Sequence, residues 1–167
     1  MRRLAVLVAA AAVAGLVAGA AQARLTPAEQ KWATPLINVW NRQNGALQLV
    51  IPIASSKNAL VAGTANNLKL TNVLVLIVTC KQAIAKAGSP PSPRLTRFLS
   101  SLQAACAADT KGANAFAKAV GAVRKKNGAL AQSYLKSGVS SFRVGTSALT
   151  KAYKSLIAIG GSSIFKA

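Results

Sequence analysis

The stretch CKQAIAKAGSPPSPRLTRFLSSLQAAC, residues 80–106, contains the only two cysteines of the chain, one on each side of a proline-rich turn. Each flanking segment contains a set of residues that recur at alternating intervals of three and four. This spacing places the members of a set on one side of a helix. The first set is Leu70, Val73, Ile77, Cys80 and Ile84, and the second is Leu95, Leu99, Leu102, Cys106, Asp109, Ala113, Phe116, Val120 and Val123. Each cysteine therefore lies on the inward side of its own helix, and the pattern predicts a helical hairpin closed by a disulfide.

Two further helical patterns flank this hairpin. Thr26-Pro27-Ala28-Glu29 is a typical helix start, with Thr26 as the N-cap and Glu29 as the reciprocal cap. After the hairpin, a 3.5-residue repeat favours coiled-coil-like packing. That repeat is Leu135, Val139, Phe142, Thr146, Leu149, Tyr153, Leu156 and Gly160. The sequence predicts an all-α protein, an antiparallel up-down-up-down four-helix bundle with one disulfide between helices 2 and 3, its helices at about 27–54, 58–87, 93–126 and 129–159.

Two places in this bundle have alternative interpretations. Residues 73–79, VLVLIVT, are apolar and β-branched enough to form a strand, although polar residues at helical spacing on both sides favour a helix. Asp109 lies on an inward stripe, where a lone charged carboxylate is costly. We expect either a cationic partner for Asp109 or a local opening of the helix near Lys111 and Gly112.

The first residues of the chain have the features of an export signal. Arg2 and Arg3 precede an Ala-, Val-, Leu- and Gly-rich run, and Ala21-Gln22-Ala23 matches a cleavage site. We predict a secretory signal peptide over residues 1–23, cleaved after Ala23, and a single helical-bundle domain over residues 24–167. An uncleaved anchor is the alternative, because the run approaches the length of a membrane span. The prediction is a secreted or extracytoplasmic protein of bacterial-type export, in which two cysteines are expected to be oxidised.

The composition argues against catalysis and metal binding. The chain has no histidine, so the usual general base near neutral pH is missing. Only two acidic residues, Glu29 and Asp109, are present, and with paired cysteines they do not make a zinc or calcium site. We therefore predict a protein that is not an enzyme and that uses no cofactor and no metal.

The charge is extreme. Removing Arg2 and Arg3 with the signal peptide leaves 19 of the 21 basic residues against two acidic ones, a net charge of +17. A basic helix face can bind along a polyanion by electrostatic attraction, without recognising a particular sequence. The alternative is a solvated face, but the charge exceeds the magnitude of about 2–8 that solubility needs. The candidate polyanion-binding residues are Arg124, Lys125, Lys126, Lys136, Arg143, Lys151 and Lys154.

These observations favour an exported, non-enzymatic cationic helical-bundle protein that binds polyanions of the cell envelope or the extracellular matrix. The expected partner is an anionic polymer, such as a cell-wall polymer or extracellular nucleic acid, or an anionic membrane surface. One alternative is a membrane-active cationic protein, which requires an exposed apolar face. Another is a carrier that holds a small apolar ligand in the bundle core.

Overall fold

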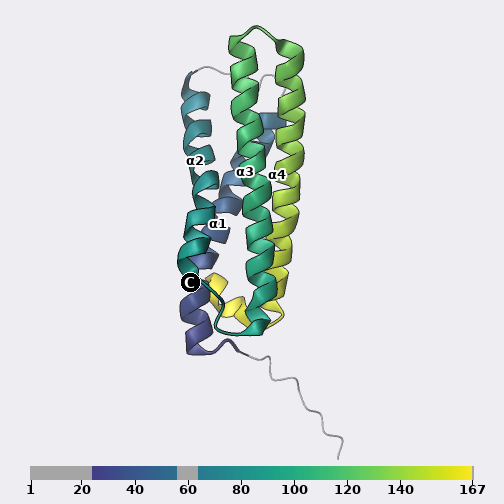
Figure 1. The fold of residues 1–167 in the computed structure, drawn as a ribbon. Helices are drawn as coiled ribbons and strands as arrows, with labels where there is room; N and C mark the ends of the chain where they lie inside the picture. Colours follow the sequence, from purple (N-terminus) through teal and green to yellow (C-terminus); the bar gives the residue numbers. More distant parts are fainter. Residues whose placement is uncertain (1–23, 56–63, 167) are drawn as a thin grey trace, which may run out of the picture.

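The protein is described by a computed structural model for residues 24–55 and 64–166 (Figure 1). The described chain forms four α-helices and two short 3-10 helices, and it contains no strand. These elements are α1 (Pro27–Ser55), α2 (Thr64–Ala87), η1 (Pro93–Leu95), α3 (Thr96–Arg124), α4 (Gly128–Ile157) and η2 (Gly161–Lys166). The all-α prediction is confirmed, and residues 73–79 are part of α2 rather than a strand. The predicted signal peptide and residues 58–63, the predicted start of the second helix, lie outside the described residues.

The helix boundaries follow from local chemistry. At the start of α1, the Thr26 backbone N–H donates to Glu29 Oε2 at 2.8 Å, and the Glu29 N–H donates to Thr26 Oγ1 at 3.3 Å. This confirms the predicted reciprocal cap. The Asn127 side chain accepts a hydrogen bond from the Leu130 N–H at 3.0 Å and caps α4. Gly88 and Gly160 follow α2 and α4 with φ of 66° and 86°, a conformation that glycine adopts without steric cost.

The helices pack around a shared apolar core. Figure 1 shows α3 and α4 side by side along their length, joined by a short turn at one end of the molecule. Helix α2 contacts α1 and α3, while α1 also contacts α4. Phe98, Phe116 and Phe142, from α3 and α4, are fully buried in this core. The chain end returns to the bundle, because η2 packs on α1 and α4.

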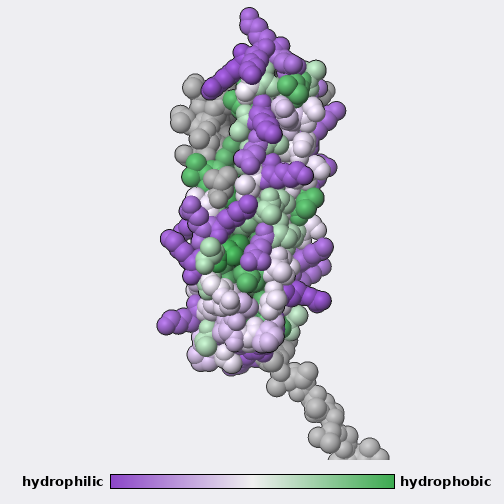
Figure 2. Space-filling model, viewed as in Figure 1, coloured by the Kyte–Doolittle hydropathy of each residue, from purple (hydrophilic) through white to green (hydrophobic). Residues whose placement is uncertain are grey.

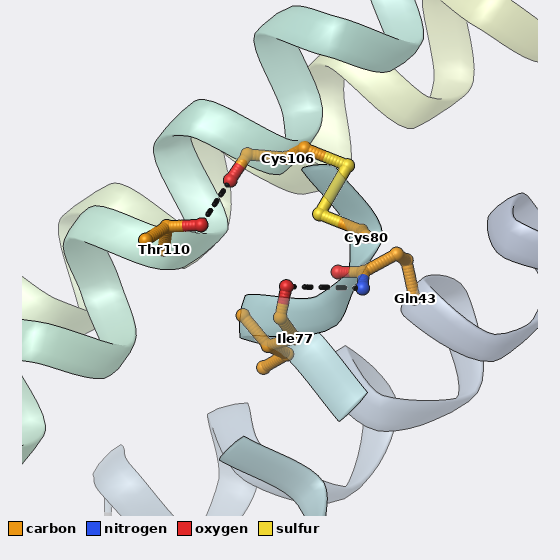
Figure 3. The surroundings of a disulfide bond; sticks show 5 residues. All are labelled: Gln43, Ile77, Cys80, Cys106 and Thr110. Atoms are coloured by element: carbon orange, nitrogen blue, oxygen red, sulfur yellow. Dashed lines mark hydrogen bonds between the residues drawn. A yellow bond between two sulfur atoms is a disulfide. The ribbon is translucent and has the colours of Figure 1, made fainter. Parts of the chain in front are cut away.

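The two cysteines form the predicted disulfide (Figure 3). Cys80 of α2 and Cys106 of α3 have their Cα atoms 6.0 Å apart, within the range that a disulfide spans. Both residues are buried. Gln43 of α1 lies beside them, and its Nε2 donates to the Ile77 carbonyl of α2 at 3.4 Å. The disulfide and this hydrogen bond therefore connect α1, α2 and α3 at one level of the bundle.

The buried faces of α3 and α4 include most residues of the predicted stripes but extend beyond them. Tyr153 of the predicted α4 stripe is 39% exposed, and Val123 at the end of the α3 stripe is equally exposed. Small residues beside the stripes are buried as well. They are Ala105, Gly112, Ala115, Ala119 and Ala122 on α3, and Ala131, Gly138, Ser141, Gly145, Ala148 and Ala152 on α4. A straight helix has 3.6 residues per turn, so a strict 3.5-residue stripe drifts around it and brings the adjacent small residues into the contact.

Candidate functional site

Both acidic residues of the protein are buried. Glu29 is 3% exposed and Asp109 is 0% exposed, and the chain has no other aspartate or glutamate. Among the Lys and Arg residues whose side-chain exposure the structure describes, Arg94 is partly buried and the others are exposed. The surface consequently carries positive side chains without an acidic side chain between them.

Glu29 is neutralised by Arg94 from the turn before α3. The Arg94 Nε donates to Glu29 Oε1 at 2.7 Å, and its Nη2 forms an ion pair with Oε2. The Ser92 hydroxyl also donates to Oε1 instead of capping η1. The Arg94 guanidinium and these donors hold the pKa of the Glu29 carboxyl well below its usual range. The sequence predicts only a helix-capping role for Glu29, because no local pattern relates two residues that are 65 positions apart.

We expect Arg94→Gln to destabilise the protein at pH 6–7 and to have little effect in strong acid. The lowered pKa of Glu29 means that its contacts stabilise the fold above pH 4.5, its ordinary value, and are lost as the pH falls. Thermal unfolding of the variant at several pH values measures this difference. Arg97→Gln, which removes an equal charge from an exposed residue of α3, is the control and should lack this pH dependence. Equal losses for both variants at pH 6–7 would contradict the assignment.

Asp109 is an uncompensated polar group in the core. Neither of its carboxyl oxygens has a hydrogen-bond partner among the described residues. Burial raises the pKa of Asp109 to about 8, so the carboxyl is neutral at pH 7. The expectation of a cationic partner or of an open helix is wrong for the described chain, since α3 runs without a break through Lys111 and Gly112. Asp109 therefore adds no negative charge to the protein at neutral pH.

The seven candidate polyanion-binding residues are all exposed, and they lie in three places. Arg124 is the last residue of α3, and Lys125 and Lys126 begin the turn to α4, where hydrophilic side chains project from the end of the molecule (Figure 2). Lys136 and Arg143 line a groove of about 530 Å³ between α4 and the end of α1. Lys151 and Lys154 form the third group.

Lys151 and Lys154 lie in a groove of about 360 Å³ between α4 and the start of α3. This groove also contains Arg97 of α3, which the sequence analysis did not select. Nothing in the spacing along α4 points to a residue of α3, so this third cation follows only from the way the two helices pack.

Three of the α4 cations form a row along the helix. Lys136, Arg143 and Lys154 are separated by 7 and 11 residues, which correspond to about two and three helical turns. The 18 residues from Lys136 to Lys154 span about 27 Å at 1.5 Å per residue. We call these three residues the α4 row. A linear polymer with regularly repeated negative charges can contact all of them at once.

The described residues contain no group of three or more His, Cys, Asp or Glu side chains that could hold a metal ion. None of the helices in residues 24–55 and 64–166 is both long enough and apolar enough to cross a membrane. Comparison of the chain with protein-family models, with curated proteins and with solved structures finds no match.

Proposed function

We propose that the protein is an exported, non-enzymatic cationic helical-bundle protein that binds polyanions of the cell envelope or the extracellular matrix. The observation that carries this proposal is the burial of both acidic residues. Glu29 is paired with Arg94, and Asp109 is neutral at pH 7, so the exposed charged side chains of the described residues are all cationic. A surface of one sign concentrates polymers of the opposite sign.

The proposal includes an antiparallel up-down-up-down order of the four helices. Contacts between α1 and α2, α2 and α3, and α3 and α4, together with the contact between α1 and α4, support this order. The short connections before α3 and before α4 also support it, because short loops join antiparallel neighbours. In this arrangement α3 and α4 share the turn that carries Arg124, Lys125 and Lys126.

The aromatic side chains favour a partner recognised by charge rather than by its bases. Trp40 donates its indole N–H to the Leu149 carbonyl at 2.8 Å and stacks on Tyr153 with ring centroids 5.7 Å apart. Phe165 of η2 contacts both rings, at 5.3 Å and 4.8 Å between centroids. This cluster therefore uses its rings to hold η2 on the bundle, whereas base recognition needs rings free for stacking. Binding is expected to depend on the density of negative charge in the polymer.

The α4 row provides a specific test. We expect the oxidised protein of residues 24–167 to bind polyphosphate and duplex DNA, with an affinity that falls steeply between about 50 and 200 mM salt. The triple variant Lys136→Gln/Arg143→Gln/Lys154→Gln should bind more weakly and reduce the slope of log affinity against log salt by about 2 to 3 on DNA, since each lost phosphate contact removes about 0.9. Fluorescence anisotropy with labelled polymer measures both quantities.

A matched control distinguishes the contribution of the α4 row from the effect of the total charge. The control variant Lys31→Gln/Arg42→Gln/Lys86→Gln also removes three positive charges, but from exposed residues of α1 and α2. Its loss of affinity should be clearly smaller than that of the α4-row variant. Absence of polymer binding at low salt would overturn the proposed function. Release of dye from anionic vesicles without salt-sensitive polymer binding would favour a membrane-active protein, and uptake of an apolar dye would favour a carrier.

A further inference from the structure

A third groove lined by basic residues lies where α2, α3 and α4 meet, and it contains none of the α4-row residues. Its volume is about 410 Å³, within the range of small-molecule sites in proteins. Lys81 comes from α2, Lys111 and Lys118 come from α3, and Tyr134 and Ser137 come from α4. None of these five residues belongs to the candidate set selected from the sequence. Three cations from two helices thus converge on one concave surface.

The fold explains why the lysines converge. Lys111 and Lys118 are seven residues apart, so they lie on the same side of α3, about 10 Å apart along its axis. Lys81 directly follows Cys80, which the disulfide joins to Cys106 of α3. This covalent connection, with Cα atoms 6.0 Å apart, sets the position of α2 on α3 and so places Lys81 beside the other two lysines.

The groove is positive without an internal counter-charge. Glu29 is engaged by Arg94, and Asp109 is buried and lacks a salt bridge among the described residues. The Lys118 Nζ lies 5.9 Å from the centroid of the Tyr134 ring, a cation–π distance that keeps this ammonium group at the groove. Three ammonium groups on one concave surface repel one another, and a bound anion relieves that repulsion.

We propose that this groove is a binding site for phosphate groups, and specifically for two or more consecutive phosphates of a chain. Lysine is a common phosphate ligand and binds phosphate as a point charge, without the fixed geometry of an arginine fork. The charged residues that line this groove in the described part of the chain are all lysines. The hydroxyl groups of Tyr134 and Ser137 add hydrogen-bond donors for phosphate oxygens. The inference rests on the proposed function and narrows its partner class to polymers that contain phosphate.

The test uses inorganic tripolyphosphate as the probe, because it is too short to follow the whole surface. Titration calorimetry at constant ionic strength compares the oxidised protein of residues 24–167 with Lys81→Gln/Lys111→Gln/Lys118→Gln and with the control Lys31→Gln/Arg42→Gln/Lys86→Gln. We expect a loss of affinity of at least about tenfold for the groove variant and of less than about threefold for the control. Far-UV circular dichroism establishes that each variant retains its helices.

A second measurement locates the probe without any substitution. In amide NMR spectra, tripolyphosphate should shift the signals of residues 110–118, Tyr134 and Ser137 more than those of Arg143 and Lys154. Citrate, a carboxylate of comparable charge, should bind more weakly than tripolyphosphate at the same ionic strength.

Different outcomes would contradict the phosphate-binding groove and the proposed function. Equal losses for the two triple variants, absence of tripolyphosphate binding, shifts spread over the whole surface, or equally tight citrate binding would each overturn the phosphate groove. Each of those results would still be compatible with salt-sensitive binding of long polymers, and therefore with the proposed function. Loss of that polymer binding would instead overturn the proposed function.

Discussion

Raising the pH from about 4 to about 8 is expected to lower the free energy of unfolding by up to roughly 5 kcal/mol through Asp109 alone, at about 1.4 kcal/mol per pH unit. Burial raises the pKa of this carboxyl from 3.8 to about 8 in the folded protein. Between these values the unfolded chain releases a proton that the folded chain retains. The stability is therefore highest below the unfolded pKa and declines as the pH rises through this interval.

Asp109→Asn measures this contribution. The variant keeps the shape of the side chain but cannot ionise, so the decline between pH 4 and pH 8 should disappear from its denaturation curves. Near pH 4 it should be about as stable as the parent, and near pH 8 it should be more stable. A parent protein whose stability does not change over this interval would contradict the assignment of a neutral, buried Asp109.

Glu29 produces the opposite trend in acid. Its pKa lies below the ordinary value of 4.5 because of Arg94, so its contacts weaken as the pH falls through the acid range. Asp109 and Glu29 together predict maximal stability near pH 4 to 5. The protein should be less stable both in stronger acid and at neutral pH.

Gly145→Ala is expected to lower the free energy of unfolding by about 3 kcal/mol, the upper end of the usual cost of overpacking a core. A Cβ atom at this position would lie 1.7 Å from Asp109 Oδ1 and 2.7 Å from its Cγ. The carboxyl of Asp109 is short and fully buried, so it has little room to move away. The two helices would have to separate at this level. Urea denaturation followed by circular dichroism measures the loss.

Gly121→Ala is the matched control for this substitution. Gly121 is also inside a helix, α3, but a Cβ atom there has no neighbour within 4 Å. Alanine is the better helix former by about 1 kcal/mol, so this variant should be as stable as the parent or more stable. A Gly145→Ala protein with the same stability as Gly121→Ala would show that α3 and α4 do not approach so closely.

The double variant Asp109→Ala/Gly145→Ala identifies the atoms responsible. Removing the carboxyl creates the space that the new methyl group needs. The double variant should therefore be more stable than the sum of the two single losses predicts, because residues in contact are not additive. Additive losses would place the strain of Gly145→Ala elsewhere.

Local features of the sequence were sufficient to predict most elements of the fold. The reciprocal cap of Thr26 and Glu29 involves residues three positions apart, and Gly88 ends α2 by its own backbone preference. The pairing of Cys80 with Cys106 followed from periodicity, which placed both on inward sides. The two helix ends depend on neighbours along the chain, so they are visible in the sequence. The disulfide was predictable because the chain has only two cysteines. The total charge follows directly from the amino-acid composition.

Only the tertiary structure decided how closely those helices pack and which side chains contact one another. The large residues of α3 and α4 suggested one contact face, but glycine and alanine at the adjacent positions permit the closest approach of the two helices. That close approach brings Asp109 against Gly145 and leaves it without a hydrogen-bond partner among the described residues. The pairing of Glu29 with Arg94 and the meeting of Lys81 with Lys111 likewise join residues far apart in the chain. The sequence thus determined how much positive charge the protein has, and the packing of the helices decided where that charge is left unpaired, because side-chain partners depend on helix rotation and not on spacing within one helix.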